Sequence, residues 1–161
     1  VRVGSAAQSG SSAPPPAHGR STSRAASVAG KQSAPSGPVL GLPGASQAGG
    51  GGVQKSSTDG IAFPFRELST EAGARVVEVS ANQVLFWSES ARAAMVYRSP
   101  EDFSVENGAI VDARTGSVWA IDGRAVRGPR AGERLDPVAS AYVALASAWF
   151  DFHPDSGVWR E

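Results

Sequence analysis

The sequence predicts a mainly β fold of the α+β class: a twisted antiparallel sheet or partly open barrel with one C-terminal helix, preceded by a disordered N-terminal segment. Three observations support this prediction. The first 57 residues are rich in Ser, Ala, Gly and Pro. From Ile61 onward, short apolar segments alternate with turns that contain Gly, Asn or Asp, a pattern typical of antiparallel strands. Near the C-terminus, large apolar residues recur at helical spacing.

Residues 1–57 form the first predicted region, a low-complexity linker. They include runs of proline at 14–16 and of glycine at 49–52, and they contain no aromatic residue. Such a composition buries too little apolar surface to offset the entropy lost on ordering. We therefore expect a disordered tether over residues 1–57 and a small β-rich domain over residues 58–161.

The domain begins with a series of short predicted strands. In residues 91–98, Met95 and Tyr97 alternate with Ala94 and Val96, which indicates a strand with at least one buried face. Pro64 lies in the first strand, and because proline cannot donate a backbone hydrogen bond, an edge position is predicted for that strand. The strands in this part of the chain are expected at residues 61–65, 75–80, 83–87, 92–98 and 103–106.

The predicted helix covers residues 139–150. Tyr142, Ala146, Trp149 and Phe150 fall at i, i+4, i+7 and i+8, so they share one face of a helix. Asp136 and Pro137 supply a start, and Pro154 ends the pattern. The four tryptophans are expected to be core residues rather than a binding platform, and Trp159, two residues from the end, is the one for which exposure is expected.

A polar turn is expected between two strands, one ending at Asp112 and the next covering residues 117–121. Gly116 occupies the position most in need of a positive φ. The side chains of Asp112, Thr115 and Ser117 suit an Asx-type or Ser/Thr-type turn, in which they bond nearby backbone amides. An Asp-Gly pair at 122–123 predicts a second tight turn.

These turns belong to an ordered set of residues that resembles a known bacterial and archaeal family, called domain of unknown function 3179. The family typically shows D-x-x-T-G-S-x-W, then G-x-A-x-x-G-P-x-x-G-x-x-L, then an aromatic helix and a P-D-T-like tail. The resemblance covers roughly residues 58–161. The matching residues here are Asp112, Thr115, Gly116, Ser117, Trp119, Gly123, Ala125, Gly128, Pro129, Gly132, Leu135, Trp149, Phe150, Phe152, His153, Pro154 and Asp155.

This chain differs from many members of that family in one respect. The resemblance implies a Cys-Pro-x-Cys motif near the middle of the domain, where this chain has residues 86–91 and where, as in the whole sequence, no cysteine occurs. Thiol redox or thiolate-metal chemistry therefore cannot be carried over. No cofactor and no metal site is predicted, since one folded-domain histidine, His153, is too few for the usual zinc ligand set. We expect His153 to cap the helix carbonyls instead.

Two functional arrangements remain as alternatives to a purely structural turn. In the first, arginines line a polar pocket beside Trp119 and grip a carboxylate or phosphate. In the second, Ser117, His153 and Asp112 form a catalytic triad, although nothing places Ser117 on a strained elbow. The candidate residues for the polar pocket are Arg98, Asp112, Thr115, Ser117, Trp119, Arg124 and His153.

Composition and charge limit the classes of binding partner that the sequence predicts. Residues 1–58 carry five basic and no acidic residues, whereas the remainder carries ten arginines and fifteen acidic residues. The basic charges are too sparse to favour nucleic-acid binding, and no apolar run is long enough to span a membrane. The chain is soluble as given, and an extracytoplasmic location is expected if a signal segment precedes Val1.

The sequence favours a non-enzymatic binding or interaction module on a flexible tether, with a small anionic ligand or a protein as partner. A hydrolase-like enzyme acting on an anionic substrate and a structural accessory domain are the alternatives.

Overall fold

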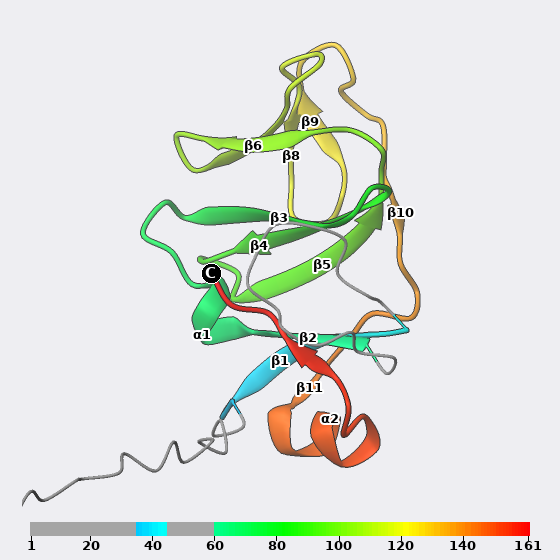
Figure 1. Cartoon of the computed structure of the whole chain (residues 1–161). Coiled ribbons are helices and arrows are strands. Elements are labelled where there is room, and N and C mark those ends of the chain that lie inside the picture. The colour runs from blue at the N-terminus through cyan, green and yellow to red at the C-terminus, as the bar shows by residue number, and fades with distance from the viewer. Residues whose placement is uncertain (1–34, 45–59) are drawn as a thin grey trace, which may run out of the picture. The chain divides into compact units, whose positions relative to one another are not determined.

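The computed structural model describes residues 35–44 and 60–161 (Figure 1). The described residues belong to one compact unit. Its described part contains short strands and two short helices. The strands are β1 (Pro38–Pro43), β2 (Gly60–Pro64), β3 (Ala74–Ser80), β4 (Gln83–Ser88), β5 (Ala93–Arg98), β6 (Phe103–Glu106), β7 (Ala109–Asp112), β8 (Val118–Trp119), β9 (Ala125–Arg127), β10 (Asp136–Pro137), β11 (Tyr142–Leu145) and β12 (Gly157–Val158), and the helices are α1 (Phe65–Leu68) and α2 (Ala146–Phe152).

The strands form three four-stranded sheets. The base sheet has the order β11-β1-β2-β12, the central sheet β10-β5-β4-β3, and the top sheet β6-β7-β8-β9. All of the strand pairs are antiparallel except β12 with β2, which are parallel. The prediction of a mainly β, mainly antiparallel fold with one C-terminal helix is confirmed.

The sheets stack as layers, with α2 beneath the base sheet (Figure 1). One apolar core, which includes Leu40, Phe63 and Trp87, joins the base and central sheets. A second core, which includes Phe86 and Trp119, joins the central and top sheets. A third, smaller core lies between the base sheet and Trp149 of α2.

Strand β4 shows why the central sheet occupies the middle layer. Its residues Val84, Leu85, Phe86 and Trp87 form an uninterrupted apolar run, and all four are buried. Alternate side chains of a strand point to opposite faces, so Leu85 and Trp87 enter the lower core while Val84 and Phe86 enter the upper core. A strand that is apolar at every position is typical of a sheet covered on both sides.

Strand β1 lies in the segment that the sequence analysis assigned to the linker, and for residues 38–43 that assignment is wrong. β1 pairs with β2 on one side and with β11 on the other, and its side chains from Val39 to Leu42 are buried. The apolar run is short and is surrounded by Gly, Pro and Ser, so the composition of this region indicated a linker rather than a strand. The rest of the predicted linker lies outside the described residues.

Gly41 explains how β1 fits so close to α2. A Cβ atom at this position would lie 2.0 Å from the Trp149 ring, far inside van der Waals contact. The glycine therefore lets the fully buried indole lie directly on the backbone of β1.

The predicted helix over residues 139–150 is wrong in its first half. Residues Tyr142–Leu145 form β11, paired with β1, and the helix begins only at Ala146 and ends at Phe152. Asp136 and Pro137 form β10, which pairs with Arg98 and Tyr97 of β5 rather than starting a helix. Because the partner strand β1 was not recognised, nothing in the sequence favoured a strand at 142–145.

Two further expectations differ from the structure. Pro64 ends an internal strand, β2, rather than an edge strand; β12 pairs only as far as Ala62, so nothing beside Pro64 requires an N–H. Trp159 is buried rather than exposed, because its ring packs 6.1 Å from that of Phe63.

No helix in the described part of the chain is long and apolar enough to cross a membrane.

Candidate functional site

The polar turn between β7 and β8 is built around a buried carboxylate. Asp112 has no exposed surface. The backbone N–H of Thr115 donates to its Oδ1 at 2.6 Å, the Thr115 hydroxyl donates to Oδ2 at 2.7 Å, and the Trp119 indole N–H donates to Oδ2 at 3.1 Å. Gly116 has the positive φ that the sequence suggested, 69°. The Asx-type turn is therefore present.

The second motif closes over this turn. The backbone N–H of Arg130 donates to Ser117 Oγ at 3.0 Å, and Ser117 Oγ lies 2.7 Å from the Thr115 hydroxyl. A Cβ on Gly128 would lie 2.7 Å from Ser117 Cα, so only glycine allows the chain to approach so closely. A chain of hydrogen bonds thus runs from Arg130 through Ser117 and Thr115 to Asp112.

Arg130 is the guanidinium that lies beside Trp119, and the sequence analysis missed it. Its Cζ is 4.9 Å from the centre of the Trp119 ring. The same group forms ion pairs with Glu101 and, at 2.8 Å, with Glu133. Only the Gly128–Gly132 turn, which folds the chain back over Ser117, could have indicated this position.

The charge state of Asp112 follows from these contacts. Burial alone would raise its pKa, but hydrogen bonds from Trp119 and Thr115, together with the charge of Arg130, outweigh burial and hold the pKa below its ordinary value. The carboxylate is therefore ionised and fully engaged. Its hydrogen bonds stabilise the fold. It offers no free oxygen and no exposed surface to a ligand.

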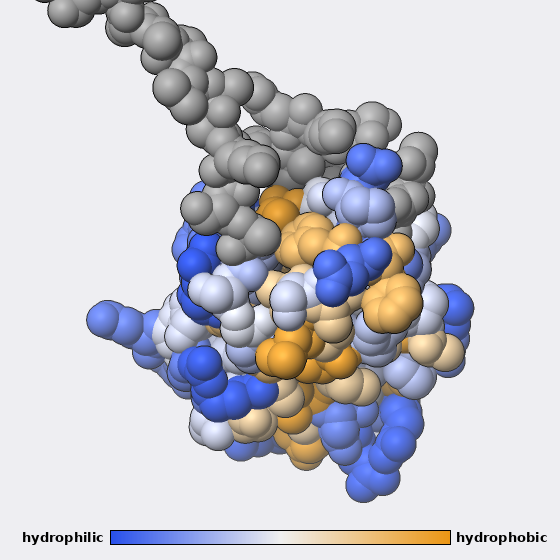
Figure 2. All heavy atoms as spheres, turned by 90° about the horizontal axis from the view of Figure 1, so that it is seen from below, coloured by the Kyte–Doolittle hydropathy of each residue, from blue (hydrophilic) through white to orange (hydrophobic). Residues whose placement is uncertain are grey.

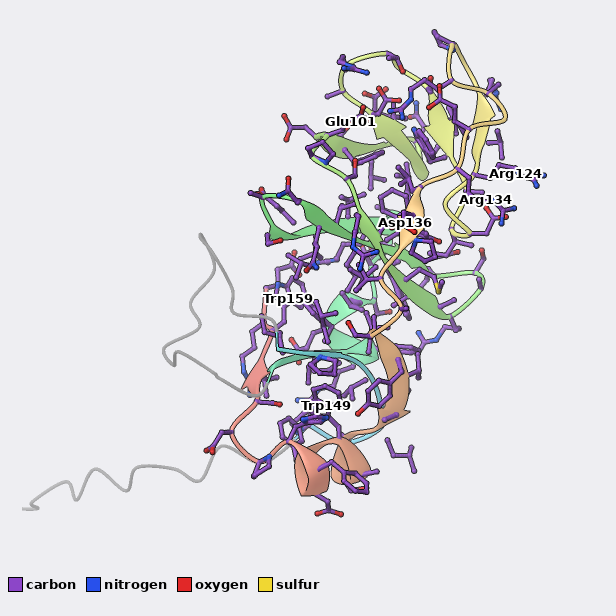
Figure 3. All side chains as sticks on the ribbon, turned by 90° about the vertical axis from the view of Figure 1, so that its right-hand side faces the viewer. Glu101, Arg124, Arg134, Asp136, Trp149 and Trp159 are labelled. Carbon is purple, nitrogen blue, oxygen red and sulfur yellow. The ribbon has the colours of Figure 1, made fainter. Side chains whose placement is uncertain are left out.

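Arg98 and Arg124 do not join Asp112. Arg98 forms an exposed ion pair of 2.7 Å with Asp136, while Arg124 lies opposite Arg134 in an isolated antiparallel bridge. In Figure 3, the Arg124 and Arg134 side chains lie near each other and point outward. Neither Arg124 nor Arg134 has an ion pair with another described residue.

His153 lies in the layer of α2, at the opposite end of the stack from the polar turn (Figure 1). Its backbone N–H caps the helix by donating to the Trp149 carbonyl at 2.8 Å. Its ring stacks 4.2 Å from that of Trp149, and its Nε2 lies 3.1 Å from the Tyr142 hydroxyl. The predicted cap is thus made by the backbone, and the imidazole contacts aromatic neighbours.

A second carboxylate that the sequence analysis did not single out, Glu89, ties together the turn after β4. Trp87 Nε1, Thr70 N and the Ser69 hydroxyl donate to one of its oxygens, and Arg92 binds the other at 2.8 Å. These bonds, with that from Trp87 the largest, lower the pKa of Glu89 to about 2. Residues 86–91, where the family resemblance implies a Cys-Pro-x-Cys motif, are therefore held in place by the ionised carboxylate of Glu89.

Two of the hollows in the described part of the surface lie near strands β3 and β4. One of about 130 Å³ is lined by three carboxylates, Glu78, Glu101 and Asp102, but Glu101 already binds Arg130 and Arg114. The other, of about 240 Å³, lies between Leu42 of β1 and the β3–β4 turn and contains no charged side chain. Among residues 35–44 and 60–161, no group of three His, Cys, Asp or Glu side chains suited to a metal ion is found.

Four of the exposed large apolar side chains lie on β11 and α2. We call Tyr142, Val143, Leu145 and Phe152 the edge surface; their exposed fractions are 43%, 54%, 64% and 80%. Figure 2, which views the molecule from the side of α2, shows exposed apolar residues at that end of the domain. β11 is also the outermost strand of the base sheet.

The fold and these sites define a layered, mainly β domain with a buried polar brace and an open apolar strand edge. The chain matches the family model described as Protein of unknown function (DUF3179) over residues 29–156, and it belongs to that family. The match includes β1 and the residues between β1 and β2. No curated protein and no solved structure matches the chain.

Proposed function

We propose that this domain is a non-enzymatic protein-interaction module, and that its binding surface is the edge surface. The observation that carries the proposal is a strand, β11, which has a sheet neighbour on one side only among the described strands and has large apolar side chains exposed along it. Exposed apolar edge strands are sites at which a second chain adds a strand.

The backbone of β11 supports strand addition. Ala146 N donates to Gly37 O at 2.9 Å, and in the same register Ala144 opposes Val39. Because hydrogen-bonded pairs alternate along an antiparallel ladder, Ala144 also directs its backbone groups toward β1. Val143 then directs its N–H and C=O groups, and Leu145 its N–H group, to the open side, while the C=O of Leu145, the N-cap residue of α2, accepts the first bond of that helix.

The positions of the candidate catalytic groups argue against the hydrolase alternative. Ser117 and Asp112 are fully buried in the top layer and bond other protein groups, whereas His153 lies at the far end of the stack and contacts Tyr142. No triad geometry results from this arrangement.

A labelled hexapeptide of alternating valine and threonine is a direct probe of strand addition. We expect the full chain to bind it, and the double variant Val143→Lys/Leu145→Lys to bind it at least ten-fold more weakly, because charged side chains disfavour edge pairing. Fluorescence anisotropy measures both affinities. Val126→Lys is the matched control, since Val126 is equally exposed, at 55%, but lies on β9. Equal binding by all three proteins would refute the assignment.

Arg124 and Arg134 favour a second candidate function, binding of an anionic ligand. Like charges placed opposite each other across a bridge repel, and an anion that binds both guanidiniums would relieve this repulsion. Neighbouring Asp122 offers only partial compensation, since its carboxylate accepts a bond from the Arg124 backbone, at 3.1 Å.

This candidate is tested by thermal unfolding with inorganic phosphate or citrate at constant ionic strength. A ligand at ten times its dissociation constant stabilises by about 1.4 kcal/mol, which raises the Tm by roughly 5 °C for a domain of this size. Arg124→Gln and Arg134→Gln are expected to abolish the shift and Arg66→Gln to retain it, because Arg66 pairs with Glu67 elsewhere. An unchanged shift in all variants would exclude this site.

A further inference from the structure

We infer that the partner which the edge surface binds is a second copy of this chain, joined by antiparallel pairing of β11 with β11 about a two-fold axis at Ala144. This inference rests on the proposed function of the edge surface and specifies its partner.

The outward-facing backbone groups of β11 are complementary to themselves. Val143 and Leu145 lie symmetrically about Ala144, and both face the open side. An antiparallel copy therefore places Val143 opposite Leu145 of the second copy, and Leu145 opposite Val143 of the second copy. In each pair the Leu145 N–H donates to the Val143 carbonyl. The Val143 N–H donates to the Leu145 carbonyl, whose second lone pair is available beside the bond that it accepts as the N-cap of α2.

The side chains match in the same register. Val143 and Leu145 share the face of the base sheet that carries Leu40, since Val143 opposes Leu40 and side chains alternate along a strand. In the dimer, each exposed valine would contact an exposed leucine of the second copy. Cross-strand apolar pairs of this kind stabilise sheets.

The chemistry of this edge also favours a copy over a polar partner. Residues 142–146 carry no charge and no proline, so the edge has none of the usual protection against pairing. The opposite edge of the base sheet is different, because β12 has only two residues and pairs in parallel with β2. Two-fold pairing at β11 thus forms a closed dimer rather than an open fibre.

The exposed area is of the right order for a dimer. With roughly 150–250 Å² for a large aromatic side chain, the exposed fractions of Tyr142 and Phe152 alone correspond to about 250 Å² per copy. The exposed parts of Val143 and Leu145 add to this area. Stable interfaces bury about 800 Å² per partner, and the strand backbone and neighbouring rim residues of α2 would supply the remainder.

Sedimentation equilibrium of the full chain tests the inference. We expect a monomer–dimer equilibrium, weakened at least ten-fold by Val143→Lys/Leu145→Lys and left unchanged by Val126→Lys. A strictly monomeric wild type at millimolar concentration, or a dimer insensitive to the double variant, would overturn it.

A disulfide provides a second, geometric test. In the proposed dimer, Ala144 lies opposite Ala144 of the second copy in a pair that is not hydrogen-bonded. The two Cα atoms of such a pair are about 4.5 Å apart, which is within the range that a disulfide spans. Because the chain lacks cysteine, Ala144→Cys introduces a single thiol. We expect it to cross-link under mild oxidation much faster than Val126→Cys; equal rates would count against the axis at Ala144.

The two proposals fail in different ways. If the chain stays monomeric while the valine–threonine hexapeptide still binds at β11, the second copy is the wrong partner and the proposed function stands. If the peptide does not bind at β11 and does not compete with dimer formation, the edge surface is not the binding surface of the domain.

Discussion

A chain shortened to residues 58–161 is expected to lose its cooperative unfolding transition, because it lacks β1. That strand lies between β11 and β2, and it buries Val39, Leu40 and Leu42. Fully burying each such side chain contributes about 1.5–3 kcal/mol, so their loss approaches the whole stability of about 5–15 kcal/mol expected for a domain. Far- and near-ultraviolet circular dichroism during heating measures the transition.

The control is a chain of residues 29–161, which retains β1 and the full family match. It is expected to unfold cooperatively, with a Tm close to that of the 161-residue chain. If the chain of residues 58–161 had the same Tm as this control, β1 would be dispensable to the fold.

Replacing Asp112 with alanine is expected to destabilise the domain by about 3 kcal/mol, because bonds to a buried charge from Trp119 and Thr115 are lost and their donors left unpaired. The corresponding fall in Tm is roughly 10 °C. Asp112→Asn keeps one acceptor oxygen and should cost about half as much. Urea unfolding measures both changes, and Asp136→Asn, at an exposed ion pair, is the control with little effect.

The difference in the free energy of unfolding between wild type and Asp112→Asn changes with pH in a predictable direction. The folded-state pKa of Asp112 is lower than its ordinary value, so its stabilisation is fully present above the unfolded-state pKa of about 4 and is lost as pH falls through the folded-state pKa. The gap between wild type and Asp112→Asn should therefore be constant from pH 7 to about 5 and should shrink below 4. A gap that instead widens on acidification would contradict an ionised, hydrogen-bonded Asp112.

The parts of the fold that the sequence predicted are those determined by local chemistry. Asp112, Thr115 and Gly116 form a turn whose bonds lie within a few residues, and alternation in residues 91–98 indicated a strand. β1 and β11 depend on each other across more than 100 residues, and neither is distinctive alone. Tyr142 and Val143 fit a helix or a strand equally well until the partner is known.

The candidate site was harder to predict than the fold for a related reason. The motif correctly joined Asp112, Thr115, Ser117 and Trp119, but the arginine beside them comes from the turn that folds back over Ser117. Local spacing could not distinguish Arg130 from Arg98 or Arg124. The edge surface carries no motif at all, because exposure of Val143 and Leu145 is a property of sheet order rather than of sequence.

The base sheet also has a consequence for how the chain folds. Its strands come from both ends of the domain, since β1 and β2 precede the central and top sheets in sequence while β11 and β12 follow them. The hairpins of the central and top sheets close short loops and can form early, whereas the base sheet must wait for a closure spanning most of the domain. During synthesis, the apolar faces of β1 and β2 remain without β11 until the C-terminal residues emerge.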